Sequence, residues 1–398
     1  MMQQYDVLVI GGGVVGLATA GLLADASRQL KVIVVDANTK PPREDTRLGL
    51  RVSAIANGSI EILERLGAWD RIESERRCAY EHMRVWDSAD AADSASALRF
   101  DADDFGLPYL GYIVENTAIQ RALLHRLNVL GVNVRYGASV ESIDREEPQV
   151  VVRLSDGETI TTDLLVGADG SSSRVRDCVG IDVSRIQYQQ TAIVTHLRPE
   201  HDHEATAWQR FLPTGPIALL PLSDGRVSTV WSTNEPDNAL AADDETLGRL
   251  LTEASDAVLG ELTVDGPRGS FPLNAHHARN YVTENIVLVG DAAHAVHPLA
   301  GQGANLGLQD AAVLALTVGD AVSGGVHPGE RRVLRRYERA RKGENATMMH
   351  ALTALNRLFA SNLPFSSELR RTGMQLFNVS GPIRERVVER ALGSKPVR

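Results

Sequence analysis

Cysteine is nearly absent from this chain of 398 residues, which contains only Cys78 and Cys178. Two isolated cysteines provide no disulfide framework and too few thiolates for a structural zinc site, so we expect a reducing compartment. The N-terminus also lacks a charged segment followed by an apolar segment and a cleavage site, which argues against export by a signal peptide. We therefore expect a cytoplasmic protein.

Long apolar runs are missing too. The most apolar stretch, residues 286–322, is interrupted by polar side chains that include Asp291, Gln302, Gln309, Asp310 and Asp320. We therefore expect no helix that spans a bilayer. Peripheral contact with the inner membrane stays open, because an amphipathic helix needs no long apolar run. The C-terminal segment offers apolar side chains either for such contact or for packing within the protein: Leu355, Leu358, Phe359, Leu363, Phe365, Leu376 and Phe377.

Positive charge is in deficit, since 41 basic side chains face 51 acidic ones and the net charge is -10. This balance argues against a nucleic-acid backbone as a partner. The clustered arginines lie between Glu330 and Glu338, which predicts a solvated helix face: Arg331, Arg332, Arg335 and Arg336.

A glycine-rich turn near the N-terminus carries the first functional signal. The apolar run 7–10 is followed by Gly11, Gly13 and Gly16 and then by small apolar residues at helical spacing. In such a strand–turn–helix unit the first glycine allows the tight turn, the second lets the backbone approach a pyrophosphate, and the third allows close packing of the helix on the strand. Asp36 ends the next predicted strand and is placed to accept hydrogen bonds from a ribose. This pattern predicts a dinucleotide site but does not distinguish NAD from FAD.

A second motif lies far downstream. The apolar strand 286–289 delivers Gly290 and Asp291 to the carboxyl edge of a parallel sheet, where such folds bind ligands. A loop then leads into a helix predicted over 306–318, and it contains Pro298, Gly301, Gly303, Ala304 and Asn305. Free N–H groups and the positive end of the helix dipole stabilise negative charge there, as on a reduced flavin near N1 and O2. Two distant motifs that need one ligand favour FAD.

Two further signals have competing interpretations. Residues 164–174 repeat the strand–turn–helix pattern around Asp169 and Gly170, although the serines that follow also suit a purely structural helix cap. His294 and His297 with Asp291 have residue types that suit zinc or iron, but a glycine loop has no role in a metal site. We therefore favour the flavin and expect no metal.

The coarse pattern predicts an α/β fold. A Rossmann-like FAD-binding domain with a parallel sheet is interrupted by an antiparallel sheet between about residues 181 and 271, where the hairpin turn 223–226 is a strong signal. The chain ends in a helical segment that Pro364 and Pro382 divide. The expected bounds are 1–79, 104–180 and 281–345 for the discontinuous FAD-binding domain, 80–103 and 181–280 for the substrate domain, and 346–398 for the C-terminal helical segment.

These three signatures, in this order, resemble the single-component FAD aromatic hydroxylases built like para-hydroxybenzoate hydroxylase, and the similarity covers nearly the whole chain. Within that family, residues 50–55 and 111–116 and the run that begins at Gly290 look like the ubiquinone-biosynthesis hydroxylases, in particular the 2-polyprenylphenol hydroxylase branch. The resemblance implies the same fold, with the inserted sheet forming the ring pocket.

The resemblance also implies roles for individual residues. It places Arg51 near the FAD pyrophosphate, Gln120 near the ribityl chain and Asp291 on a ribityl hydroxyl. Asp169 belongs to a motif that the family uses for both FAD and NAD(P)H. Asp36 stands where the family more often has Glu, which shortens the reach to the ribose. No tyrosine that would activate the phenol can be placed.

The implied activity is hydroxylation of a polyprenylated phenol in ubiquinone biosynthesis, with NAD(P)H and O2, through a flavin C4a-hydroperoxide. The expected partners are the phenol, O2, a membrane surface, and a second copy or a biosynthetic complex. Three alternatives stay open: a small soluble phenol or benzoate as substrate, which arginines in the pocket would support; a non-catalytic FAD-binding assembly subunit; and a reductase of isoprenoid double bonds. Candidates for an apolar channel are Phe211, Leu212, Leu219, Leu220 and Trp231.

Overall fold

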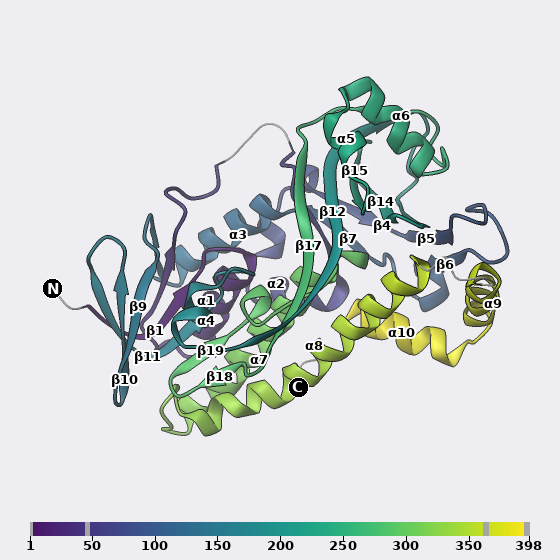
Figure 1. Cartoon of the computed structure of the whole chain (residues 1–398). Helices are drawn as coiled ribbons and strands as arrows, with labels where there is room; N and C mark the ends of the chain where they lie inside the picture. Colours follow the sequence, from purple (N-terminus) through teal and green to yellow (C-terminus); the bar gives the residue numbers. More distant parts are fainter. Residues whose placement is uncertain (1–2, 44–47, 361–365, 394–398) are drawn as a thin grey trace.

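The computed structural model describes residues 3–43, 48–360 and 366–393. Within these residues a mainly parallel sheet and a long antiparallel sheet lie at opposite ends of the molecule, and two long strands, β12 and β17, run between them (Figure 1). The α/β class and the inserted antiparallel sheet predicted from the sequence are confirmed.

The first sheet has eight strands in the described chain, and its central order is β18-β19-β11-β1-β2-β8. Strand β1 pairs in parallel with both β11 and β2, and β11 pairs in parallel with β19. The fully buried run 7–10 explains this placement, because a strand covered on both faces is apolar throughout. The strands are β1 (Gln3–Ile10), β2 (Val32–Asp36), β8 (Asn133–Tyr136), β9 (Val140–Glu146), β10 (Gln149–Leu154), β11 (Thr159–Gly167), β18 (Val282–Thr283) and β19 (Ile286–Leu288).

Helices cover this sheet and continue to the C-terminal end of the described chain. Helix α1 packs against α7 and α3, and α7 packs in turn against α8. The helices are α1 (Val14–Ala26), α2 (Asn57–Arg65), α3 (Asn116–Val129), α4 (Arg174–Cys178), α5 (Asp237–Ala241), α6 (Asp244–Ala254), α7 (Gln302–Ser323), α8 (Arg331–Phe359), α9 (Ser366–Asn378) and α10 (Pro382–Leu392). By length and composition α7 would suit a membrane span, but 61% of its apolar window is buried inside the protein, as in a core helix.

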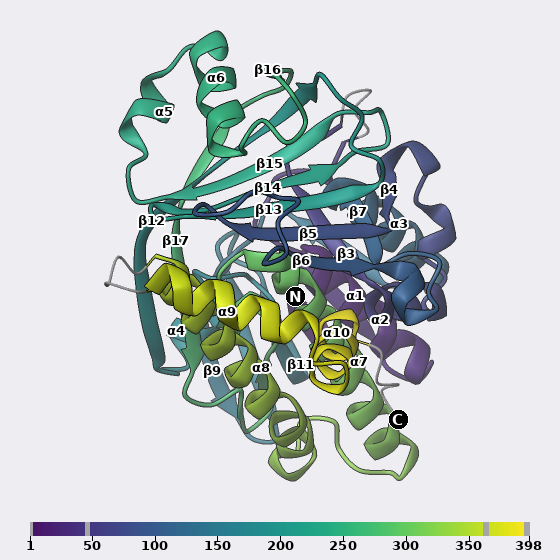
Figure 2. The same ribbon diagram turned by 90° about the vertical axis from the view of Figure 1, so that its right-hand side faces the viewer.

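The second sheet has nine strands, with the order β20-β17-β12-β15-β14-β13-β5-β6 and β16 beside β12. Helices α5 and α6 cover one face of it, and the opposite face looks toward α8 and α9 (Figure 2). We call these the outer face and the inner face. The strands are β5 (His82–Asp87), β6 (Leu98–Asp101), β12 (Val183–Pro199), β13 (Thr206–Leu212), β14 (Gly215–Pro221), β15 (Val227–Thr233), β16 (Leu262–Val264), β17 (Gly269–Ala278) and β20 (His294–Ala295).

A small sheet joins the two large ones. It has the order β3-β7-β4, and its strands are β3 (Val52–Ala56), β7 (Gly111–Glu115) and β4 (Arg77–Tyr80). Ala54 and Ile113 from this sheet pack against Leu222, which follows β14. The small sheet therefore lies between the glycine-rich loops and the inner face.

Several sequence-based expectations are corrected. The strand before the Asp169 turn begins at Thr159, well before residue 164, and Asp163 within it accepts a hydrogen bond from the side chain of Gln149. Helix α7 begins at Gln302 and not at Leu306, since Gly301 at φ 62° provides the break. Pro364, Leu363 and Phe365 lie outside the described residues.

The apolar channel candidates do not share a face. Leu219 and Trp231 alternate with inner-face residues and pack with Leu212 beneath α5 and α6 on the outer face, where they form ordinary core. Phe211 and Leu220 lie on the inner face, Phe211 against Phe359 and Leu220 in the cluster of Ala54. The channel prediction is therefore wrong for Leu212, Leu219 and Trp231. The face to which a side chain points is set by its position along the strand, and hydrophobicity alone does not reveal it.

Candidate functional site

The N-terminal glycine turn is built so that no side chain fits. Gly11 has φ +112°, and a Cβ there would lie 2.3 Å from the carbonyl oxygen of Ala168. A Cβ on Gly16 would lie 1.9 Å from the carbonyl oxygen of Gly11, so the helix packs directly on the turn. Gly13 differs, because a Cβ there would meet nothing within 4 Å among the described residues. The first turn of α1 therefore opens onto space that a ligand can approach.

Asp36 and Gln120 both reach this turn. The amide of Gly12 donates to Oδ2 of Asp36 at 2.5 Å, and the amide of Asn38 donates to Oδ1 at 2.8 Å. Nε2 of Gln120, which comes from α3, donates to the carbonyl oxygen of Gly12 at 3.1 Å. The structure thus brings the sequence-predicted ribose ligand and ribityl ligand to one turn.

Gly290 and Asp291 follow β19 and lie beside the same turn. Gly290 has φ +56°, and a Cβ there would lie 3.1 Å from a methyl carbon of Val15 in the first turn of α1. Asp291 is exposed although Gly290 and Ala292 on either side of it are buried. The two motifs that the sequence predicted to share one ligand are therefore in contact.

The loop that follows Asp291 is fixed to the small sheet by Asn305. Its Nδ2 donates to the carbonyl oxygen of Ala54 at 2.8 Å, and its Oδ1 accepts from the amide of Ala56 at 2.9 Å. A Cβ on Gly301 would lie 2.7 Å from Cβ of Ala54, whereas one on Gly303 would meet nothing within 4 Å among the described residues. Gly303 thus opens the N-terminal end of α7, while the Asn305 side chain is fully used to hold the loop.

Arg51 and Pro298 lie at the edges of this region. Arg51 directly precedes β3, its side chain is exposed, and its carbonyl oxygen accepts from the amide of Asn116 at 3.0 Å. Pro298 and Ala304 are half-buried at the two ends of the loop. These positions leave the Arg51 guanidinium accessible to a bound anion.

Asp169 and Gly170 form a turn at the end of β11, the strand next to β1. Oδ2 of Asp169 accepts from the amide of Val175, and Oδ1 accepts from the hydroxyl of Ser173, so the carboxylate caps α4. The guanidinium of Arg176 is 1% exposed and donates to the carbonyl oxygens of Ala292 at 3.1 Å and of Ser171 at 3.0 Å. Arg176 therefore ties this turn to the Asp291 loop, a role that its sequence context did not reveal.

Asp310 on α7 is a second residue that sequence reasoning missed. Its carboxylate is fully buried and accepts from the amide of Gly290 at 3.1 Å, from Nε of Arg341 at 2.8 Å and from Nδ2 of Asn345 at 3.0 Å, and it lies 2.5 Å from Nε2 of His294. Burial alone would raise its pKa, but His294 and Arg341 outweigh burial and hold the pKa well below its usual range. A charged residue inside an apolar helix was the available signal.

The metal interpretation of His294 and His297 does not match their contacts. Nε2 of His294 faces Asp310, whereas Nε2 of His297 lies 3.2 Å from Oε1 of Gln190 on β12. Within the described residues no group of three His, Cys, Asp or Glu side chains is arranged to hold a metal ion. Burial lowers the pKa of His297 to about 4, so its ring is neutral near pH 7.

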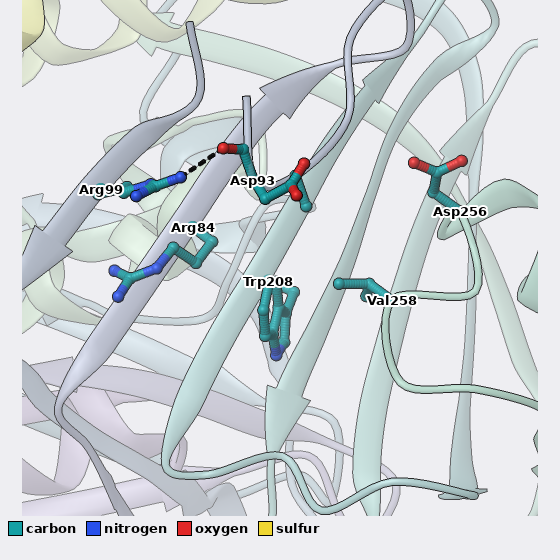
Figure 3. A pocket seen from close by; sticks show the side chains of 7 residues that line it. Arg84, Asp93, Arg99, Trp208, Asp256 and Val258 are labelled. Atoms are coloured by element: carbon teal, nitrogen blue, oxygen red, sulfur yellow. Dashed lines mark hydrogen bonds between the residues drawn. The ribbon is translucent and has the colours of Figure 1, made fainter. Parts of the chain in front are cut away.

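A hollow of about 380 Å³ on the outer face is separate from these loops (Figure 3). Trp208 forms part of its wall. The guanidinium groups beside it are already engaged, because Arg84 pairs with Asp101 at 2.7 Å and Arg99 donates to the carbonyl oxygen of Asp93 at 2.6 Å. This hollow lies on the other side of the sheet from Gly301 and does not belong to the candidate site.

Comparison with known proteins agrees with this geometry. The family model described as FAD binding domain matches residues 4–351. Ubiquinone biosynthesis monooxygenase COQ6 of Xenopus tropicalis is 36% identical, over 96% of this chain and 92% of that protein. The 3-demethoxyubiquinol 3-hydroxylase of Escherichia coli is 34% identical, over 98% of this chain and 99% of its own length.

Solved structures share the fold. The p-nitrophenol 4-monooxygenase PnpA of Pseudomonas putida superposes with a TM-score of 0.78 at 19% identity, covering 98% of this chain and 99% of that chain. HpxO of Klebsiella pneumoniae, solved with FAD and uric acid, gives a TM-score of 0.75 at 19% identity and covers 100% of this chain and 98% of its own. At this identity the likeness shows the fold alone.

The carboxylate of Asp291 provides the first test of the site. Asp291→Ala removes an exposed carboxylate and leaves the buried residues on either side of it unchanged. We expect the Kd for FAD to rise about ten- to a hundredfold, which is the usual effect of losing a hydrogen bond to a charged group. Flavin fluorescence titration measures it. Asp320→Ala, an exposed aspartate at the other end of α7, is the matched control. Equal FAD affinity in both variants would show that Asp291 has been assigned wrongly.

His297 gives a prediction for pH. Its folded pKa of about 4 lies below the usual value of about 6.5, so the unfolded chain binds the extra proton and stability falls as pH drops from about 6.5 to 4. His297→Gln should remove up to about 1.4 kcal/mol per pH unit from this slope. Thermal unfolding midpoints across that range measure it, with exposed His201→Gln as control. Identical slopes in both variants and the parent would refute the neutral, buried state of His297.

Proposed function

The chain belongs to the FAD-binding-domain family of flavoprotein monooxygenases, and we propose that it hydroxylates the ring of a polyprenylated phenol in ubiquinone biosynthesis with NAD(P)H and O2. The observation that carries the proposal is a sequence identity of 34–36% over nearly the full length of proteins named as a ubiquinone-biosynthesis monooxygenase and a 3-demethoxyubiquinol 3-hydroxylase. Ubiquinone hydroxylase UbiL of Rhodospirillum rubrum, 35% identical over 98% of this chain, supports the same activity.

The residues at the candidate site fit FAD. The open backbone at Gly13 suits a pyrophosphate, the exposed Asp291 suits the ribityl hydroxyls, and the open N-terminal turn of α7 at Gly303 suits the pyrimidine edge of the flavin. When bound, FAD supplies hydride acceptance from NAD(P)H and activation of dioxygen for transfer to the ring. The protein itself must hold these loops rigid, orient the phenol and exclude water.

The inner face supplies a suitable chamber wall. Its central positions carry small or apolar side chains, namely Ala192, Val194, Ala218 and Val230. An apolar wall of this kind suits a prenylated ring better than a charged one. The arginines of the neighbouring strands, Arg84 and Arg210, share register positions with outer-face residues.

This arrangement argues against a small carboxylated substrate. A benzoate needs a cation to offset the cost of burying its charge. Within 190–196, 216–220 and 228–232, the segments that form the central wall, the sequence contains no Arg or Lys. The inner face therefore favours a neutral phenol.

We also propose peripheral contact with the inner membrane through the C-terminal helices, where a prenylated substrate would be drawn from. Exposed apolar side chains support this contact: Leu355, Leu358, Leu376, Val379 and Val387. Leu376 on α9 is 63% exposed, and Val379 in the turn after α9 is 80% exposed. Phe359, expected in the same apolar set, is buried against Phe211.

Purified protein loaded with FAD tests the reaction. We expect short-chain prenylphenols to stimulate NAD(P)H oxidation with oxygen uptake, and we expect one atom of labelled O2 in the hydroxylated product. Benzoate serves as the comparison substrate and should stimulate less. Bound FAD without phenol-stimulated NAD(P)H oxidation would indicate a non-catalytic subunit, and product formed without oxygen uptake would indicate a reductase.

Deletion of the gene should also accumulate a prenylphenol that lacks one ring hydroxyl; an unchanged quinone profile would overturn the ubiquinone assignment.

A further inference from the structure

A polar joint on the inner face connects the second sheet, α8 and the loop 298–303. It begins at a bulge in β12, where the register to β17 shifts between Gln187 and Gln190. Gln189 within the bulge has φ +55°, a left-handed conformation that residues other than glycine rarely adopt. Beyond the bulge Ile193 packs on the outer face, so the alternation of the strand directs Gln190 to the inner face.

The side-chain amide of Gln190 is the centre of this joint. Its Oε1 accepts from Nδ2 of Asn356 on α8 at 3.1 Å and lies 3.2 Å from Nε2 of His297. Its Nε2 donates to the carbonyl oxygen of Thr214, between β13 and β14, at 3.2 Å. Gln190, His297 and Asn356 are 6%, 1% and 5% exposed, so little water competes for these hydrogen bonds. One amide therefore holds three parts of the chain together.

The ring of His297 extends the joint to the loop. Its Nδ1 accepts from the amide of Leu299 at 3.3 Å, so Nε2 carries the proton and donates to Gln190. The pKa of His297, which burial lowers to about 4, agrees with this neutral form of the ring. The ring of Tyr188 lies edge-on to it at 4.8 Å between centroids, and the Tyr188 hydroxyl lies 2.7 Å from Oγ1 of Thr353 on α8. Hydrogen bonds and packing thus fix the orientation of His297.

The loop 298–303 is anchored at both ends. Asn305 fixes the far end to the small sheet, and His297 fixes the near end to the second sheet. Leu299, which lies between these anchors, packs in one cluster with Phe211 of β13. The position of the loop relative to the inner face therefore depends on Gln190 as well as on the FAD-binding domain.

We propose that Gln190, acting through His297, is a positioning residue that fixes the loop 298–303 against the inner face and so determines whether activated oxygen reaches the phenol ring. This inference rests on the function proposed above. In the complete reaction NAD(P)H, a proton, O2 and the phenol give NAD(P)+, water and the hydroxylated ring. When the ring is not held at the correct distance, NAD(P)H, a proton and O2 give NAD(P)+ and hydrogen peroxide instead. A displacement of about 1 Å can lower a rate about a hundredfold, so a joint remote from the chemistry can control this outcome.

Two leucine variants test the joint by its effect on product yield. Gln190→Leu and His297→Leu remove the shared hydrogen bond at similar side-chain volume. Each should lower the hydroxylated product formed per NAD(P)H oxidised by about tenfold and raise hydrogen peroxide correspondingly, while the Kd for FAD and the KM for a short-chain prenylphenol change less than about twofold. His297→Gln, which retains a donor to Gln190, should recover part of the yield. The double leucine variant should be no worse than the more damaging single one, because both residues act through one contact.

Amide hydrogen exchange tests the same joint without turnover. In the FAD-loaded protein the amides of residues 299–303 should exchange about tenfold faster in both leucine variants, because the loop loses its anchor at one end. Thr195→Val is the matched control, since it loses one buried hydrogen bond on the same strand, from Oγ1 to the carbonyl oxygen of Pro267 at 3.0 Å. It should lower the thermal midpoint and leave both the yield and the exchange of the loop unchanged.

The outcomes separate the joint from the proposed function. Yield and loop exchange like those of the parent in Gln190→Leu and His297→Leu, with a thermal midpoint lowered as in Thr195→Val, would show a merely structural role and overturn the positioning role. A parent enzyme that binds FAD but oxidises no NAD(P)H in response to any phenol would overturn the proposed function instead. Hydrogen exchange would still decide whether Gln190 holds the loop.

Discussion

The buried carboxylate of Asp310 holds the loop that carries Gly290 and Asp291 in place. A carboxylate inside protein is costly unless several donors surround it, and here the Gly290 amide, His294, Arg341 and Asn345 do so. Because these donors come from the end of β19, from β20 and from α8, one side chain on α7 joins three parts of the chain. The position of the neighbouring Asp291 follows from this arrangement.

Close backbone contacts at glycine residues also hold these segments together. The carboxyl ends of β1, β11 and β19 lie side by side in a parallel sheet, where open α/β folds bind ligands. Glycine at positions 11 and 16 lets α1 start directly on the turn, and Gly290 lets the second motif approach Val15. Arg176 then joins the Asp169 turn to the same loop. The proposed FAD cradle is thus a set of short contacts between segments that are distant in sequence, and the inner face lies beyond Ala54.

The sequence was sufficient to locate the local parts of the proposed site. Strand–glycine–helix patterns depend on neighbouring residues, so the turns at Gly11 and Gly290 and the helix from Val14 to Ala26 could be located, and the structure confirms that the two turns meet. Roles that depend on distant partners could not be found in this way. Asp310 was only a polar interruption of an apolar stretch, and the side chain of Asn305 is used for the small sheet. Strand register, which hydrophobicity alone does not give, placed Leu219 and Trp231 on the outer face.

The central claim is that this buried carboxylate maintains the FAD-binding shape of the Asp291 loop. The most direct measurement is the FAD dissociation constant of Asp310→Asn, determined on protein whose fold is verified by circular dichroism. Asn keeps the volume but loses the charge that His294 and Arg341 neutralise, so the account predicts weaker FAD binding by about tenfold or more although Asp291 is intact. A folded Asp310→Asn protein that binds FAD as tightly as the parent would contradict it.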